Sequence, residues 1–387
     1  MLAEFRENIY HCLKCGACRI AYPEYTPICP SGERFGFDSY YAIGRMEIAR
    51  AVLEGRLEPG EKMAHRIFTC TSCGACEEQC RPAVGNRPLK VIEELKADLV
   101  EKGFVPANLR NFLKNVHLYG NPYQAPREKR GEWALGSGVK EYGGEEYLLY
   151  VGSEGSFDPR GQKIALALAG ILQKAGVSFG ILGSRENCDG NEVNRIGERG
   201  LFEALAEENI RTFKELGVKK VVTLSPHAYN TFKNDYPGLG AEFGAVHYTQ
   251  LIRDLIREGK LVPKKALAAR VTYHDPCFLG RHNQDYQSAR EVLGAVPGVE
   301  PVEMERNRRN SFCCSGGGGN CYADLLGGGG DRNPARIRVR EAYETGARVL
   351  ATACPACAVM LGDAPAAEGL EGLIEVRDVA EILLEAL

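Results

Sequence analysis

The arrangement of cysteines is the feature that most constrains this chain. The 15 cysteines form two groups, eight between Cys12 and Cys80 and seven between Cys188 and Cys357. A secreted disulfide scaffold is short and its cysteines pair evenly, whereas this chain has 387 residues and an odd number of cysteines. Clustered thiols in a long chain therefore indicate metal or redox chemistry in a reducing compartment.

The first group contains two runs in which three cysteines are each separated by two residues. The first run and the cysteine that follows it after ten residues are Cys12, Cys15, Cys18 and Cys29. The second run and the cysteine that follows it after three residues are Cys70, Cys73, Cys76 and Cys80. In bacterial ferredoxins such a run binds three irons of a cubane, and the fourth iron takes a thiolate from the other run. The spacing thus predicts two [4Fe–4S] clusters, one on Cys12, Cys15, Cys18 and Cys80 and one on Cys70, Cys73, Cys76 and Cys29.

Structural zinc is the alternative for these runs, because C-x2-C pairs also form zinc ribbons. Zinc sites use pairs, whereas these runs are triplets with a distant fourth cysteine, so iron–sulfur clusters are favoured. The long gap before Cys29 makes it the least well specified ligand. Both clusters are expected to relay electrons, since neither leaves a coordination position for a substrate.

The pattern of apolar residues predicts a helical first domain over residues 1–105. Helices are expected at 39–54 and 88–102, the second with Asn86 as a cap near its start and Gly103 at its end. No strand pattern is evident there. Residues 106–146 are expected to be a connector, in which the charged residues 127–130 form a solvated loop.

From residue 147 short β-rich runs alternate with helical patterns. Strands are expected at 147–151, 177–182, 221–224, 271–274 and 348–353, and helices at 162–175 and 198–216. Such alternation predicts Rossmann-like α/β units with parallel sheets.

A faint internal repeat divides this region into two halves, 147–262 and 263–387. Ser153 and Cys188 are separated by 34 residues, and Cys277 and Cys313 by 35. Ser225 similarly corresponds to Cys354. We expect a duplicated domain whose first half is degenerate, since a repeat of this length is not a solenoid.

The second half concentrates the remaining cysteines near strand ends and glycines. Cys277 and Cys354 each follow an expected strand, where open α/β sheets bind ligands. The adjacent Cys313 and Cys314 precede the glycines 316–319, which can approach cluster sulfides. Together with Cys357 they predict a shared metal site, while Cys321 is interpreted as a buried structural thiol. A thioredoxin-like C-x-x-C, a flexible loop and a phosphate cradle are the alternatives, the last rejected because no Gly-Lys-Ser/Thr follows.

Three segments carry a specific resemblance. YHDPCFLGR (273–281), FCCSGGG (312–318) and CPAC (354–357) resemble the cysteine-rich "CCG" domain of the B and D subunits of heterodisulfide reductase, the sulfite reductase-linked K subunit, glycolate oxidase iron–sulfur subunits and the C subunit of anaerobic glycerol-3-phosphate dehydrogenase. With the ferredoxin-like runs, nearly the whole chain is similar to iron–sulfur oxidoreductases that are like the D subunit of heterodisulfide reductase. Ser315 replaces the usual glycine of that motif.

The resemblance implies a third, noncubane [4Fe–4S] cluster, in a domain that cleaves disulfides. Its implied ligands are Cys277, Cys313, Cys314, Cys354 and Cys357. In the first half Ser153, Asp189, Ser225 and Ala228 stand where a full motif has cysteine, so one such cluster is implied rather than two.

Four further residues are candidate catalytic groups. Glu186, His227, His274 and Arg281 are expected to face the third cluster, as is Cys188. The histidines could deliver protons, since each follows a strand and histidine titrates near neutrality; a structural role is the alternative. Arg281, Arg308 and Arg309 could attract an anionic substrate, although solvent exposure is the default expectation.

Composition restricts the class of function. The net charge of −3 and the 26% of charged residues exclude a polycationic nucleic-acid surface. No apolar run approaches the roughly 18 residues of a membrane span, and the charged first ten residues lack a signal-peptide core. We expect a cytoplasmic protein, with attachment to the inner face of a membrane through a partner as a further possibility.

The function expected is that of an iron–sulfur oxidoreductase subunit in an anaerobic redox complex, where two cubanes pass single electrons to the third cluster for disulfide reduction. A non-catalytic subunit that links a flavoprotein or electron-transfer flavoprotein to a membrane quinone or cytochrome partner is the alternative. A zinc-stabilised interaction module is the third class considered.

Overall fold

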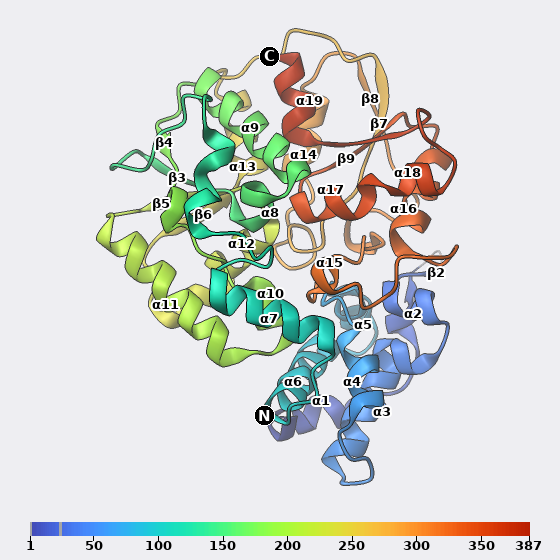
Figure 1. The fold of residues 1–387 in the computed structure, drawn as a ribbon. Coiled ribbons are helices and arrows are strands. Elements are labelled where there is room, and N and C mark those ends of the chain that lie inside the picture. The colour runs from blue at the N-terminus through green and yellow to red at the C-terminus, as the bar shows by residue number, and fades with distance from the viewer. Residues whose placement is uncertain (1, 23–24) are drawn as a thin grey trace.

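The structure is a computed structural model that describes residues 2–22 and 25–387. Its N-terminal part, drawn in blue in Figure 1, is helical and lies below two parallel sheets. The helices of this part are α1 (Arg6–Tyr10), α2 (Pro30–Phe35), α3 (Ala42–Leu53), α4 (Glu61–Phe68), α5 (Ala75–Ala83) and α6 (Pro88–Glu101). Short 3₁₀ turns occur at Leu2–Phe5, Ala17–Arg19 and Asp38–Tyr40.

The two helices expected in this part are present as α3 and α6. Helix α3 begins later than expected because residues 38–40 form a separate 3₁₀ turn. The N-cap of α6 is Arg87 rather than Asn86, whose side-chain oxygen instead accepts from the Arg87 amide. No strand was expected in this part, and that expectation is wrong, because β1 (Ile20–Ala21) and β2 (Thr26–Pro27) form a short antiparallel pair.

The segment expected to be a connector contains α7 (Ala107–Tyr119) and the 3₁₀ helix η4 (Arg127–Ala134). The interpretation of residues 127–130 as a solvated loop is wrong at Arg130, which is 1% exposed. Its guanidinium pairs with the equally buried Glu186 at 3.4 Å. The charge run therefore includes one residue that is held inside the protein by an opposite charge from a distant segment.

Two four-stranded parallel sheets follow. The first has the order β4-β3-β5-β6 and consists of β3 (Tyr147–Tyr150), β4 (Phe179–Gly180), β5 (Lys220–Thr223) and β6 (Gly244–His247). The second has the order β10-β9-β7-β8 and consists of β7 (Ala269–Tyr273), β8 (Val299–Val302), β9 (Val349–Thr352) and β10 (Glu375–Asp378). In both sheets the first strand in sequence lies between the second and the third, so the two topologies are the same.

The expected parallel α/β organisation is confirmed, and the five expected strands are present as β3, β4, β5, β7 and β9. Sequence patterns missed β6, β8 and β10. All three lie at sheet edges, and each combines exposed or half-buried residues with at most two buried ones. An edge strand that is half exposed lacks the apolar run that identifies a buried parallel strand.

Helices cover both sheets. Those of the first half are α8 (Gly152–Phe157), α9 (Pro159–Lys174), α10 (Asn191–Ile196), α11 (Arg199–Glu215), α12 (Pro226–Asn230) and α13 (Tyr248–Arg257). Those of the second half are α14 (Ser288–Gly294), α15 (Asn320–Ala323), α16 (Pro334–Glu344), α17 (Pro355–Gly362), α18 (Ala364–Ala367) and α19 (Val379–Ala386). The halves pack through α9 against α19 and α13 against α14.

The buried core consists of three clusters of apolar side chains. One joins the N-terminal helices to the first half, and another joins the two halves. The third joins the N-terminal part to the second half and contains Cys73 together with Cys277 and Cys313. This last cluster places the two groups of cysteines in one continuous core.

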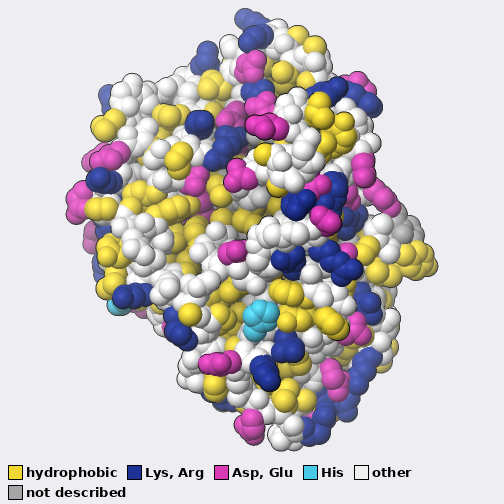
Figure 2. Space-filling model, turned by 45° about the vertical axis from the view of Figure 1, so that its right-hand side comes forward, with side chains coloured by type: hydrophobic (Ala, Val, Ile, Leu, Met, Phe, Trp, Pro, Cys, Tyr) yellow, Lys and Arg dark blue, Asp and Glu magenta, His cyan; other side chains and the backbone are white. Residues whose placement is uncertain are grey.

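The surface is mixed in charge. On the face drawn in Figure 2, basic and acidic side chains are interspersed among apolar ones. None of the described helices has the length and apolarity needed to cross a bilayer.

Candidate metal centres

The eight N-terminal cysteines line two small cavities, four in each. The first cavity is lined by Cys12, Cys15, Cys18 and Cys80. The second is lined by Cys29, Cys70, Cys73 and Cys76. Each cavity thus combines three cysteines of one run with the fourth cysteine of the other.

Both triplets are shaped by the same local turn. Gly16 and Gly74 follow the second cysteine of each run with φ of 79° and 76°, a left-handed conformation that glycine adopts without strain. A 3₁₀ turn begins after Gly16 and helix α5 after Gly74. The third cysteine of each run therefore lies in the first turn of a helix, close to the other two.

Crowding of thiols makes these cavities unfavourable for isolated thiolates. Burial raises the pKa of Cys18 to about 12, and the nearby Cys29, Cys12 and Cys80 contribute. Burial likewise raises the pKa of Cys29 to about 12, against the opposing charge of Arg45. Four thiolates in such a space require a cation, which a metal centre supplies.

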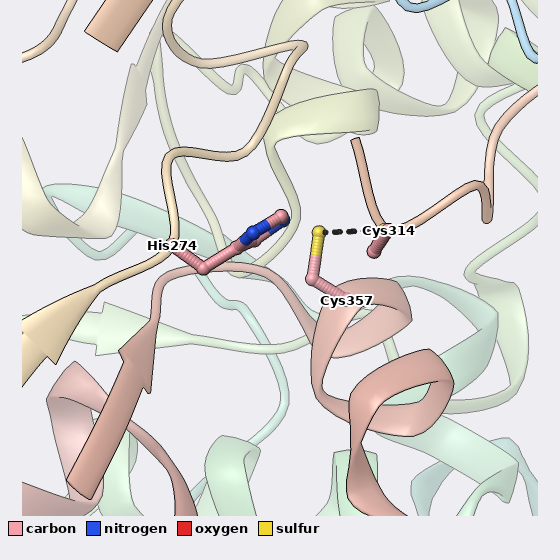
Figure 3. A group of neighbouring side chains, drawn as sticks. All are labelled: His274, Cys314 and Cys357. Atoms are coloured by element: carbon pink, nitrogen blue, oxygen red, sulfur yellow. Dashed lines mark hydrogen bonds between the residues drawn. The ribbon is translucent and has the colours of Figure 1, made fainter. Parts of the chain in front are cut away.

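The five cysteines of the second half converge at the ends of its central strands β7 and β9. Cys313 raises the pKa of the Cys277 thiol, and Cys314 and Cys354 raise that of the Cys357 thiol, because these thiols lie beside one another. The sulfur atoms of Cys314 and Cys357 are 3.4 Å apart, as drawn in Figure 3. All five residues are buried.

Local structure explains part of this convergence. Cys354 is the N-cap of α17 directly after β9, and its sulfur accepts from the Cys357 amide at 3.4 Å. The proline at the start of α17 favours helix initiation and aims Cys357 at the same site. Strands β7 and β9 are neighbours in the sheet. Cys277, which follows β7, therefore lies at the same carboxyl end of the sheet as Cys354, which follows β9.

His274 lies beside this group, turned toward Cys357 in Figure 3. A ring nitrogen and the sulfurs of Cys314 and Cys357 all lie within 4.8 Å of one another. Arg338 donates to His274 Nδ1 at 3.1 Å. Burial, with the charge of Arg338, lowers the pKa of His274 to about 3, so the ring is neutral and its proton resides on Nε2.

His227 approaches the same cysteines from the first half. Its side chain hydrogen-bonds Cys354, and its Nδ1 lies 2.7 Å from Glu192 Oε1. Burial lowers the pKa of His227, but the bonds to Cys354 and Glu192 outweigh burial and raise it well above its usual range. Burial opposes ionisation of Cys354 too, yet Cys357 and His227 lower its pKa to about 6. A charged imidazole therefore faces this thiolate.

Arg281 is 4% exposed, so the default of solvent exposure that was the alternative for this arginine does not hold. Its Nε donates to the Cys73 carbonyl at 2.7 Å and its Nη1 to the Ser311 carbonyl at 2.6 Å. Its charge acts on the thiols of Cys73, Cys277 and Cys313. Arg308 and Arg309 lie on the surface, as the default expectation had it.

Glu186 lies in a different environment from the other three candidates. Its carboxylate pairs with Arg130 and accepts from the Val151 amide at 3.2 Å. Burial raises its pKa to about 7. None of its described partners is a cysteine of the second half.

The first half places other residues where the second half has its cysteines. Ser225 caps α12 after β5, in the position that Cys354 occupies at α17 after β9. Ser153 follows β3 and accepts a hydrogen bond from Arg130 Nη2 at 2.9 Å. Cys188 is the single cysteine here, and it accepts from the Gly190 amide. The first half therefore does not repeat the group of five cysteines that the second half brings together.

Two residues around the site gave no signal in the sequence. Glu192 joins His227 to the Gly319 amide, which donates to its Oε2 at 2.6 Å. Arg338 is fully buried and holds His274. Each shares its helix with at least one other charged residue, a pattern that ordinarily indicates a solvated face. Cys321, expected to be buried, is partly exposed at α15.

Comparisons with known proteins agree with this organisation. Residues 154–233 and 271–362 match the cysteine-rich domain family, and residues 8–84 match the 4Fe-4S dicluster domain family. Over 395 residues the chain is 31% identical to the D subunit of the dihydromethanophenazine:CoB–CoM heterodisulfide reductase of Methanosarcina barkeri, covering 97% of this chain and 93% of that protein. The chain belongs to the family of heterodisulfide reductase D subunits. The family resemblance expected from the motifs is thereby confirmed.

Longer relatives of this heterodisulfide reductase D-type chain are also similar. It is 39% identical over 332 residues to the probable iron-sulfur-binding oxidoreductase FadF of Bacillus subtilis. It is 36% identical over 333 residues to the EtfAB:quinone oxidoreductase of Syntrophomonas wolfei. In both cases the match covers 83% of this chain but 46% of the relative, so the chain spans about half the length of these proteins.

Proposed function

We propose that this iron–sulfur oxidoreductase passes electrons singly through two [4Fe–4S] cubanes to a third [4Fe–4S] centre, at which a disulfide is reduced. The cubane ligands are the two sets of four cysteines that line the N-terminal cavities. The third, noncubane centre is held by Cys277, Cys313, Cys314, Cys354 and Cys357. The observation that carries the proposal is the convergence of these five buried cysteines from three distant segments.

The residues present fit such a centre. Thiolates are the ligands of iron–sulfur clusters, and five at one buried site exceed what a single tetrahedral ion takes. Arg281 Nη2 is a buried donor without a partner among the described residues, in a side chain whose charge acts on Cys73, Cys277 and Cys313. A buried guanidinium nitrogen normally has an acceptor, and cluster sulfur would provide one.

The protein's own groups supply protons and orientation. When bound, the third centre would supply single electrons and a place for substrate sulfur. Reduction of a disulfide consumes two electrons and two protons and yields two thiols. His227 holds a proton beside Cys354, and Glu192 keeps it charged. Neutral His274 holds a proton on Nε2, and Arg338 fixes the ring.

Substitution of Cys314 tests the proposal. We expect Cys314→Ser to lose disulfide-dependent oxidation of a reduced viologen while both cubane EPR signals remain. Cys188→Ser, in the degenerate half, is the matched control and keeps the activity. Wild-type protein isolated without air is expected to contain about twelve irons per chain, and its third centre should give a thiol-dependent EPR signal. Full turnover in Cys314→Ser would show that the third centre is not the site of reaction.

One observation favours a second candidate function. The match to the EtfAB:quinone oxidoreductase covers 83% of this chain, which supports a subunit that carries electrons between an electron-transfer flavoprotein, or another flavoprotein, and a membrane quinone or cytochrome partner. In that case the protein would sit at the inner face of the membrane through its partner. A third centre whose EPR spectrum ignores added thiol, in protein that still transfers electrons, would favour this function over disulfide reduction.

A further inference from the structure

The turn that carries Cys73 lies directly against the segment that carries Cys313. The thiol of Cys313 lies close enough to that of Cys73 to raise its pKa, although 240 positions separate the two residues along the chain. Both belong to the same buried cluster. Since Cys73 lines the second N-terminal cavity and Cys313 belongs to the group of five, this contact joins two of the candidate centres.

We propose that the Cys73–Cys313 contact is the junction through which electrons pass between the second cubane and the third centre, and that Arg281 is the positioning residue that holds it closed. This inference rests on the proposed function. It assigns to Arg281 a role other than substrate binding.

Arg281 fastens both sides of the contact. One edge of its guanidinium donates to the carbonyl of Cys73 itself, and another to the carbonyl of Ser311, two residues before Cys313. The planar fork of arginine holds two acceptors in a fixed relation, which a lysine cannot do. Because the side chain is buried, these bonds are shielded from water.

Further polar contacts hold the same turn from other directions. His282 Nε2 lies 2.9 Å from the Ser72 carbonyl. Lys96 Nζ donates to the Cys70 carbonyl at 2.7 Å and to Ser72 Oγ at 3.1 Å. The carbonyls of three residues in the turn, Cys70, Ser72 and Cys73, are thus all bound by buried or half-buried side chains.

The glycines after Cys314 set the separation of the two segments. A Cβ at Gly317 would lie 2.5 Å from the Thr71 carbonyl oxygen, and a Cβ at Gly318 would lie 2.6 Å from that of Cys70. Neither oxygen can move easily, since both belong to backbone. The glycine run therefore allows a close approach of the two backbones that any side chain would widen.

The burial of the cysteines places the three centres in sequence. Cys15, in the first cavity, is exposed, whereas all five cysteines of the second half are buried. Cys18 of the first cavity is close enough to Cys76 of the second to raise its pKa, and Cys29 of the second cavity likewise raises the pKa of Cys18. Electrons from outside would therefore enter at the first cubane, continue to the second, and cross the Cys73–Cys313 contact last.

A matched pair of glycine variants tests the separation. Gly317→Ala forces the Thr71 carbonyl away, whereas Gly328→Ala, in the same half, meets no atom within 4 Å. Neither glycine has a positive φ, so both tests are free of backbone strain. Arg281→Gln and Arg308→Gln form a second pair, since Arg308 is a surface residue paired with Glu303.

The measurement is rapid-freeze EPR of the iron-loaded protein after mixing with titanium(III) citrate. In Gly317→Ala and Arg281→Gln we expect normal reduction of both cubanes and severalfold slower reduction of the third centre, because electron transfer between two centres slows steeply as their separation grows. The two control variants should follow the wild type. Iron content and cubane potentials are determined on each variant.

Two results would overturn the junction. One is a third centre that is reduced at the wild-type rate in both test variants with full iron content. The other is loss of the second cubane in both, which would give the contact a role in assembly instead. A failure of the proposed function would give a different result. In that case the third centre would still be reduced through this contact, and more slowly in the two test variants, but no disulfide would be reduced by the wild type.

Discussion

At the level of single residues, the chemistry of this protein depends on where the fold places each cysteine side chain. Spacing within a run is local, so three of the proposed ligands of each cubane are specified by a few neighbouring residues and one glycine turn. The fourth ligand comes from a distant position, and it depends on packing. Cys29 is the clearest case, since it lies far from the usual spacing yet lines the second cavity.

The first prediction concerns this residue. Cys29→Ala should lower the iron content by about four per chain and abolish one cubane EPR signal, since a [4Fe–4S] cluster needs four thiolates. Cys321→Ala is the matched control, because Cys321 lines neither N-terminal cavity. Iron analysis and EPR of protein prepared without air provide the measurement. Unchanged iron in Cys29→Ala would assign the fourth ligand elsewhere.

At the level of elements, the two halves share the same arrangement of strands and helices but carry different side chains at corresponding positions. Helices α12 and α17 both begin with a capping residue and a proline directly after a strand. The cap is Ser225 in one half and Cys354 in the other, so the same corner offers a hydroxyl in one half and a thiol in the other. In the first half the buried Arg130 instead bonds Ser153 and Glu186.

The halves are also joined by a buried carboxyl group, which leads to the second prediction. Asp378 caps α19, and its Oδ1 accepts from Tyr248 of α13 at 2.6 Å. Burial raises its pKa to about 7. Protonation therefore favours the folded state, and this contribution, present below pH about 4, is lost as the pH rises to about 7.

Asp378→Asn removes this dependence, because asparagine caps a helix as well as aspartate and does not ionise. Between pH 5 and pH 8 the free energy of unfolding of the wild type should fall relative to that of Asp378→Asn by up to about 3 kcal/mol. Urea denaturation followed by circular dichroism measures the difference. Asp254 lies on the exposed side of α13, so the free energy of unfolding of Asp254→Asn should change with pH as that of the wild type does. The prediction would be contradicted if the free energy of unfolding of Asp378→Asn also changed with pH in the same way as that of the wild type.

At the level of the whole molecule, the N-terminal part is joined to both halves by buried side chains. Two of its helices are very short: α1 has five residues and α2 has six. Helices of this length are not stable alone, so their order depends on packing and on the centres between them.

Removal of iron provides the third prediction. In the iron-free protein, hydrogen exchange should increase over residues 11–22, 25–36 and 69–80, because metal binding stabilises the fold that brings the ligands together. The strands β3, β5, β7 and β9 should remain protected, since apolar packing holds them. Mass spectrometry of exchange with and without iron measures both regions. Equal protection of the N-terminal segments in the two forms would show that the site is preformed.

Some of this protein could be inferred without coordinates. The cysteine triplets, the central strands and the two similar halves depend on short-range spacing and on apolar runs, which are visible in one dimension. Three of the four edge strands, β6, β8 and β10, were missed because half-exposed segments lack such runs, and α7 was missed in the expected connector. The charges of Arg130, Arg281 and Arg338 gave no indication of burial, because a charged residue is buried only where a distant partner satisfies it.

Tertiary packing alone decided how these pieces act together. It placed His227 of the first half on Cys354 of the second, separated Glu186 from the other candidates, and brought Cys73 against Cys313. Arg281 reaches the Cys73 carbonyl across 208 positions of the chain. Contacts between residues so far apart in the chain depend on which surfaces two folded parts bury against each other. The local sequence around each residue does not predict which surfaces these are.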